Sequence, residues 1–266
     1  MKKNLGRYER QLLAYAQLRG KNTIRTGEMS KSLRLSPKQE RELLSRLTRA
    51  GMIARVSRGL YLVPQRLPLG GKWSPSEVLA IDTLIKDRGG SYQICGPNAF
   101  HRYGFDEQIP NRTYVYNNRI SGERKVGPIA LSLIKVANKR LGSTEEIHTE
   151  ENINLVYASR VRTLVDAVYD WSRFNSLPRA YDWIRRELKM KRVSPGDLVN
   201  ITLQYGDTGT IRRMGVILEK EGVGALLLSR LNSALKPTTS LISWIPSRPK
   251  RGIVNRRWGV LINETA

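Results

Sequence analysis

The sequence is poor in side chains that bind transition metals or form disulfides, with one cysteine, Cys95, and two histidines, His101 and His148. A single cysteine excludes an internal disulfide and any zinc site built from several cysteines. No apolar run approaches the roughly 18 residues of a membrane-spanning helix, and the N-terminus lacks the apolar core of a signal peptide. We therefore expect a cytoplasmic protein with no metal site and no membrane partner.

The usual motifs of nucleotide-dependent and nucleophilic enzymes are also missing. The chain has neither a Gly-x-x-x-x-Gly-Lys-Ser/Thr phosphate loop nor a Gly-x-Gly-x-x-Gly fingerprint, and no motif pairs a histidine with a serine or with Cys95. We predict no enzymatic activity and no cofactor. One enzymatic alternative stays open, a metal-dependent nuclease, because acidic-x-Lys pairs occur at Glu123-x-Lys125 and Glu187-x-Lys189, with Asp106 upstream of the first.

What the sequence holds in excess is positive charge. It has 46 Lys and Arg against 23 Asp and Glu, a net charge of +23. Residues 1–66 alone hold 16 basic and 4 acidic residues, so about half of the excess lies in a quarter of the chain. Positive charges in such excess repel one another in the folded state, and a polyanionic partner usually compensates this repulsion. The composition therefore indicates a protein that binds nucleic acid.

A stretch rich in proline and glycine separates the basic segment from the rest. Between Pro64 and Pro75 the sequence reads Pro-Gln-Arg-Leu-Pro-Leu-Gly-Gly-Lys-Trp-Ser-Pro, which is typical of a linker. We predict two domains, a basic one of residues 1–66 and a larger one of residues 73–266.

The basic segment has the pattern of three helices followed by a hairpin. Apolar residues at helical spacing predict a first helix over 4–19, and Thr26 is placed to cap a short second helix. Ser36 opens a third helix, with a capping box and a proline at the first helical position, and Gly51 ends it. Residues 52–63 predict two short strands around a turn. This order is typical of a winged helix-turn-helix domain that binds DNA.

The third predicted helix has an apolar face and a polar face. Leu43, Leu44 and Leu47 form the apolar stripe. The opposite face and its flanks carry Lys38, Arg41, Glu42, Ser45, Arg46 and Arg49, and the hairpin carries Arg55 and Arg58. In a winged helix the third helix enters the major groove and the hairpin follows the phosphate backbone or minor groove. These residues are therefore candidate DNA contacts, although a charged helix face can also be only a solvated surface.

The rest of the chain predicts a small mixed sheet followed by a helical bundle. Ser74 and Ser159 are placed to cap helices, and Pro97 to start a short one. The expected strands lie at 113–116, 129–136 and 153–157, and further helices near 179–189, 195–204, 208–221 and 225–235. The predicted fold class is α+β, an N-terminal winged helix-turn-helix followed by a larger domain.

Two features of the larger domain allow more than one interpretation. Tyr169, Trp171, Tyr181 and Trp183 are able to stack on bases, but aromatics at this spacing on adjacent helices more often belong to the core. The C-terminal tail has five basic residues, Arg248, Lys250, Arg251, Arg256 and Arg257. They can be interpreted as a second phosphate contact, as an RNA-binding strip or as solvated charge.

Six segments carry a family resemblance that spans nearly the whole chain. They are Arg58-Gly-Leu-Tyr-Leu-Val-Pro64, Glu77-Val-Leu-Ala-Ile, Gly96-Pro-Asn-Ala-Phe-His-Arg-Tyr-Gly-Phe105, Thr113-Tyr-Val-Tyr-Asn-Asn118, Ala158-Ser-Arg-Val-Arg-Thr-Leu-Val-Asp-Ala167 and Arg212-Arg-Met-Gly-Val-Ile-Leu-Glu219. Together they make the sequence similar to the AbiEi-type antitoxins, the first component of a bacterial abortive-infection, type IV toxin–antitoxin system.

The resemblance implies a non-enzymatic antitoxin of a phage-defence system. Its winged helix would bind inverted repeats in double-stranded operator DNA and repress its own operon, often cooperatively. Its C-terminal part would oppose a co-encoded nucleotidyltransferase-like toxin, classically without a stable complex. The implied DNA contacts are Lys38, Gln39, Arg41, Ser45, Arg49, Arg55 and Arg58, and no catalytic residue is implied.

The expected function is therefore a transcriptional repressor that serves as an antitoxin. The alternatives are a metal-dependent nuclease or restriction-type subunit with a winged-helix targeting module, and a constitutive RNA-binding accessory protein.

Overall fold

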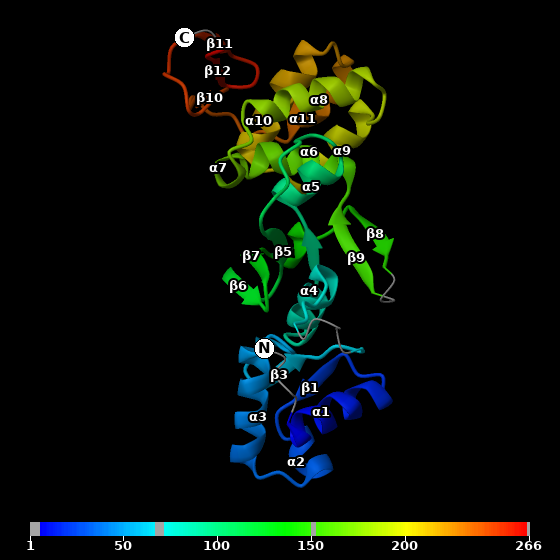
Figure 1. The fold of residues 1–266 in the computed structure, drawn as a ribbon. Helices are drawn as coiled ribbons and strands as arrows, with labels where there is room; N and C mark the ends of the chain where they lie inside the picture. The colour runs from blue at the N-terminus through cyan, green and yellow to red at the C-terminus, as the bar shows by residue number, and fades with distance from the viewer. Residues whose placement is uncertain (1–5, 67–71, 150–152, 265–266) are drawn as a thin grey trace. The chain divides into compact units, whose positions relative to one another are not determined.

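The structure, a computed structural model, describes residues 6–66, 72–149 and 153–264 (Figure 1). Its helices are α1 (Arg7–Leu18), α2 (Glu28–Leu33), α3 (Pro37–Arg49), α4 (Glu77–Lys86), α5 (Gly96–Arg102), η1 (Asn138–Arg140, a 3₁₀ turn), α6 (Arg160–Tyr169), α7 (Trp171–Phe174), α8 (Arg179–Lys189), α9 (Pro195–Tyr205), α10 (Thr208–Lys220) and α11 (Ala225–Ser233). Its strands are β1 (Thr23–Arg25), β2 (Ala54–Ser57), β3 (Leu60–Leu62), β4 (Tyr92–Ile94), β5 (Thr113–Asn117), β6 (Gly122–Val126), β7 (Ile129–Lys135), β8 (Thr144–His148), β9 (Asn154–Ala158), β10 (Ile242–Ser243), β11 (Ile253–Asn255) and β12 (Val260–Ile262).

The fold is α+β with mixed sheets, as the sequence predicts. Strand β7 pairs in parallel with β5 and antiparallel with β6, and β12 pairs in parallel with β10 and antiparallel with β11. Within the described ranges, no helix is long and apolar enough to cross a membrane.

The described residues form two compact units. The first comprises those up to Tyr92, Asn111–Lys135 and the described part of His148–Leu155; the second comprises Gln93–Pro110, Val136–Ile147 and those from Val156 onward. The first unit thus adds α4 and strands β5 to β7 to the predicted domain of residues 1–66. Part of the predicted linker, residues 67–71, lies outside the described residues, and the division into domains 1–66 and 73–266 stays a prediction.

Helices α1, α2 and α3 enclose a hydrophobic core that runs from Leu12 to Val63 and includes the predicted leucine stripe of α3. The start of α3 is confirmed. The Ser36 hydroxyl accepts a hydrogen bond from Gln39 N at 3.3 Å, and Gln39 Oε1 accepts one from Ser36 N at 2.8 Å. These reciprocal bonds satisfy two backbone donors at the helix start and fix where α3 begins.

The predicted cap of α2, Thr26, is wrong. Residues 23–25 form β1, and Thr26 N donates to Gly59 O at 2.9 Å, which extends the pairing of β1 with β3 by one residue. The residue that precedes α2 is Gly27, whose φ of 96° lies in the left-handed region and which has no side chain for capping. A short helix of this kind needs another acceptor for its first amides.

Glu40 of α3 supplies that acceptor. Its carboxylate accepts hydrogen bonds from Gly27 N and from Met29 N, both at 2.8 Å, and its side chain is 1% exposed. A buried carboxylate at a helix N-terminus is stabilised by charge-assisted hydrogen bonds and by the helix dipole. Glu40 therefore fixes α2 against α3.

The hairpin of β2 and β3 forms as predicted and is joined by an unpredicted strand. The sheet order is β1-β3-β2, with β3 antiparallel to both neighbours. Strand β1 is only three residues long, too short for an alternating pattern to mark it.

Helix α4 and the strands β5, β6 and β7 complete the first unit. The predicted cap of α4, Ser74, is wrong: the hydroxyl of Ser76 accepts from Leu79 N at 3.1 Å, whereas that of Ser74 bonds to Pro75 O. The connection predicted between β5 and β7 contains the strand β6, whose burial pattern is exposed except at Val126. Because β6 is mostly polar, it lacks the alternation of apolar residues from which a strand is predicted.

The second unit is organised around α6, which Ser159 caps as predicted. Arg162 and Asp166, one turn apart on α6, are both buried, and Arg162 Nε lies 2.9 Å from each carboxylate oxygen. Arg140 Nη2 donates to the same carboxylate at 2.9 Å, and Arg162 donates to the main-chain oxygen of Arg140 at 2.8 Å. This network ties the loop before β8 to the helical bundle.

The C-terminal strands pack on α10 in the same unit (Figure 1). Gly215 lies in the middle of α10, where a Cβ would come within 2.2 Å of the Trp258 ring. Glu219, one turn later, accepts hydrogen bonds from Asn255 at 3.0 Å and from Trp258 Nε1 at 3.1 Å. The absence of a side chain at Gly215 therefore leaves the space in which the indole ring of Trp258 packs.

Replacing Glu40 by glutamine should lower the free energy of unfolding by about 1–3 kcal/mol, because an amide can accept from only one of the two backbone donors and loses the charge. Urea unfolding followed by circular dichroism measures this. Glu42→Gln is the matched control, because Glu42 is exposed on the opposite face of α3. Equal stability of the Glu40 variant and the native protein would contradict the capping role.

Candidate nucleic-acid interface

All seven predicted contact residues have exposed side chains. Five lie on α3, one on β2 and one on the turn between β2 and β3; they are Lys38, Gln39, Arg41, Ser45, Arg49, Arg55 and Arg58. The leucines on the other side of α3 are at most 1% exposed. Helix α3 is therefore anchored by its apolar stripe and presents its basic side to solvent, which is the geometry that groove binding requires.

The seven residues differ in what else they do. Gln39 uses its Oε1 in the capping box of α3, so a base contact by this side chain would have to come from its amide nitrogen. Arg46, on the flank of the same face, lies 3.6 Å from Glu9 of α1. Glu42 is exposed among the cations, where it would repel phosphate but could accept from a cytosine amino group.

The hairpin is held in place by Asp87, at the C-terminal end of α4. Asp87 accepts a hydrogen bond from Arg25 of β1 at 2.7 Å and one from the Ser57 hydroxyl of β2 at 2.9 Å. Burial alone would raise the pKa of Asp87, but these hydrogen bonds and the charge of Arg25 outweigh burial and lower the pKa below its ordinary value. The position of Arg58 at the hairpin turn thus depends on a residue outside the predicted DNA-binding domain.

The acidic-x-Lys pairs that suggested a nuclease lie in different units, and the acidic residue of each pair has an arginine partner in its own unit. Glu123 lies on β6 of the first unit, where Arg112 pairs with it and Ser132 donates to it at 2.9 Å. Glu187 is buried in α8 of the second unit, 2.9 Å from Arg160. Among the residues that the structure describes, no group of three or more His, Cys, Asp or Glu could hold a metal ion.

The aromatic residues of α8 belong to the core, as the sequence favoured. Tyr181 stacks on Trp244 with ring centroids 3.7 Å apart, and Trp183 packs against Phe100 and Phe105. Tyr181 and Trp183 are at most 6% exposed, so neither can stack on a base.

The basic residues of the tail are exposed, and two of them have partners in the same unit. Arg257 pairs with Glu219 at 2.8 Å, and Arg248 donates to the main-chain oxygen of Glu264. The three interpretations of the tail therefore stay open.

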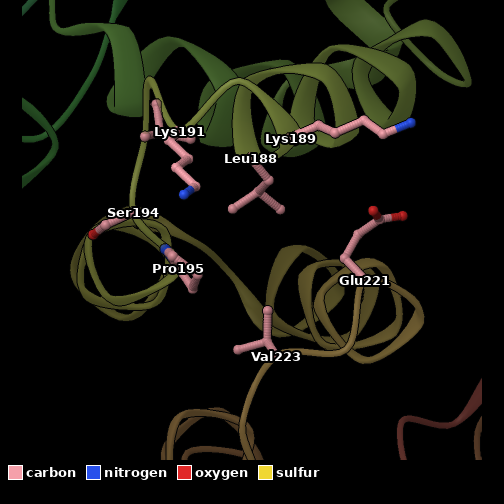
Figure 2. A pocket seen from close by; sticks show the side chains of 8 residues that line it. Leu188, Lys189, Lys191, Ser194, Pro195, Glu221 and Val223 are labelled. Carbon is pink, nitrogen blue, oxygen red and sulfur yellow. The ribbon is translucent and has the colours of Figure 1, made fainter.

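A cavity of about 480 Å³ lies in the second unit among α8, α9 and α10 (Figure 2). Leu188 and Val223 give it apolar walls, Lys191 and Pro195 lie beside them, and Glu221 is at its edge. Arg185 lies 3.2 Å from Glu221 and neutralises it. Lys189 and Lys191 are then the remaining charged residues of the described lining.

Nearly the whole chain superposes on a solved structure. The crystal structure of the Rv2827c protein from Mycobacterium tuberculosis matches 98% of this chain and 92% of its own, with a TM-score of 0.61 and 10% sequence identity. At this identity the likeness concerns the fold alone. No model of a protein family matches the sequence, and neither does any curated protein.

Replacing Asp87 by asparagine should lower the free energy of unfolding by about 1 kcal/mol at neutral pH. Because the folded-state pKa of Asp87 lies below its ordinary value of 3.8, this stabilisation is present above that value and is lost as the pH falls through the folded-state pKa. Denaturant unfolding at a series of pH values from about 7 down to 3 measures the difference between the native protein and the variant. A difference that grows on acidification would contradict the assignment.

Proposed function

We propose that residues 1–66 form a winged helix-turn-helix and that the protein is a DNA-binding transcriptional repressor. The order α1-β1-α2-α3-β2-β3 and the antiparallel sheet β1-β3-β2 support the winged-helix assignment. The observation that carries the proposal is the orientation of α3, whose leucines are buried while its basic side is exposed. In this proposal α3 enters the major groove and the hairpin follows the adjacent phosphates.

The candidate contacts have two roles in this proposal. Lys38, Arg41 and Arg49 reach base edges or phosphates from α3, assisted by Gln39 and Ser45. Arg55 and Arg58 of the hairpin contact the backbone. The charge of +23 strengthens binding through the release of counterions from DNA.

We propose further that the repressor is the antitoxin of a bacterial abortive-infection system. The resemblance to AbiEi-type antitoxins supports this part, which includes autorepression at inverted repeats in the operator, action in the cytoplasm, and neutralisation of a nucleotidyltransferase-like toxin without a stable complex. The protein itself is proposed to be neither an enzyme nor a holder of cofactors.

Replacing Lys38 or Arg49 by alanine should weaken binding to a duplex taken from the DNA that precedes the gene, by about 1–3 kcal/mol each if the side chain contacts base edges. Binding titrations with that duplex and with a scrambled duplex measure specificity. Lys189→Ala is the matched control, because Lys189 is an exposed lysine of α8 in the other unit. Equal losses on both duplexes would mean that Lys38 and Arg49 contact phosphate alone, and unchanged binding would overturn the interface.

If the protein is an antitoxin, an adjacent gene should encode a nucleotidyltransferase. Expression of that gene alone should arrest growth, and co-expression of the present chain should restore it. The Lys38→Ala variant should restore growth equally well when both genes have inducible promoters, because neutralisation is assigned to the C-terminal part. An adjacent gene without toxicity would contradict the antitoxin assignment and leave the repressor assignment standing.

A further inference from the structure

The first unit contains a cavity of about 580 Å³ at the base of the hairpin. Three parts of the chain surround it: the end of α3 with the start of β2, the segment that leads into α4, and the turn between β6 and β7. The described lining residues are Thr48, Gly51, Ile53, Arg55, Lys72, Trp73, Ser74, Lys125, Gly127 and Pro128. Its volume lies within the range typical of sites for small organic ligands.

The walls of this cavity are held by backbone contacts. Trp73 N donates to Gly51 O at 2.7 Å, which fixes the segment before α4 against the end of α3. Gly127, with a φ of 59°, places the β6–β7 turn against Ala54, whose Cβ would lie 3.2 Å from a Cβ at position 127. Strand β2 also packs against β6. The cavity therefore has a defined shape.

Three cations from separate parts of the chain line this cavity. Arg55 comes from β2, Lys72 from the segment before α4, and Lys125 from β6. Of the described residues that line the cavity, none is acidic, and no described carboxylate forms an ion pair with these three side chains. Like charges at such a site repel one another, and a bound anion would remove this repulsion.

The cavity also offers a surface for a planar ring. The side chain of Trp73 is half-buried in its wall, beside Ile53 and Pro128. Indole rings stack on bases and other aromatic rings. The hydroxyl groups of Thr48 and Ser74 add polar atoms that can accept from a ligand. The same cavity thus combines sites for an anion with a site for a flat ring.

We propose that this cavity binds a nucleoside phosphate, with the phosphates on Arg55, Lys72 and Lys125 and the base against Trp73. The shared chemistry is a phosphate joined to a planar base, which a free nucleotide or an unpaired nucleotide of a nucleic-acid strand can supply. Duplex DNA on the exposed side of α3 is a separate interaction, although Arg55 is assigned in both proposals. The variants used below change Lys72, Lys125 and Trp73, none of which is a candidate DNA contact, so their effect on ATP binding does not depend on the proposed repressor function.

Calorimetric titration of the full-length protein with ATP, tripolyphosphate and adenosine tests the proposal. ATP should bind at least about tenfold more tightly than either tripolyphosphate or adenosine, because each of these offers only one part of the ligand. Lys72→Ala and Lys125→Ala should each weaken ATP binding about tenfold, and Trp73→Leu should remove the preference for ATP over tripolyphosphate. Trp73→Phe should keep that preference. Lys135→Ala, an exposed lysine at the end of β7, is the control and should bind ATP as the native protein does.

Competition between ATP and a short single-stranded oligonucleotide distinguishes the two sources. An oligonucleotide that displaces ATP and binds more tightly points to a nucleic-acid strand, and one that does not displace ATP points to a free nucleotide; either result supports the site. Equal binding of ATP and tripolyphosphate would overturn the proposal. An equal effect of Lys135→Ala and Lys125→Ala would also overturn it, since attraction would then come from the net charge alone. None of these measurements uses operator DNA, so they test the cavity even if the protein is not a repressor.

Discussion

The orientation of the exposed basic side of α3 depends on two hydrogen bonds that the start of α2 donates to the buried carboxylate of Glu40. Helix α2 has six residues and Gly27 at its start, so it has neither the length nor the capping side chain to be stable alone. Glu40 supplies the missing acceptor from α3 and thereby sets the angle between the two helices. The leucines beside it complete the attachment, and the cations of α3 point outward as a result.

Residues of the first unit that follow the basic segment also hold the hairpin in place. Asp87 holds β1 and β2 from the end of α4, and the β6–β7 turn packs at the base of the same hairpin. The cations that face solvent around the hairpin therefore come from both sides of the predicted linker. The exposed cations of α3 and the hairpin therefore belong to a compact unit that is larger than residues 1–66.

The sequence predicted most helices because their apolar residues recur at helical spacing, and it predicted α3 best because Ser36 and Gln39 mark its start. It missed β1 and β6, since a three-residue strand and a polar edge strand have no alternating pattern. Because β6 has no such pattern, the sequence marks Lys125 only as part of an acidic-x-Lys pair. The sequence does contain a signal for Glu40, since it shares the helical face of Leu43, Leu44 and Leu47, where a carboxylate must find buried partners. The partners of Asp87 come from distant segments, as does Arg160 beside Glu187, and no local pattern can reveal such pairs.

The contact between Gly215 and Trp258 links the sequences of two distant segments. Glycine lowers helix stability by roughly 1 kcal/mol relative to alanine, so helix formation alone would favour its replacement in α10. The indole seated above it forbids any such change, because even a methyl group would occupy the space of the ring. During divergence among descendants of this chain, we expect these two positions to change together, because a substitution at either one alone weakens the packing of the C-terminal strands on α10.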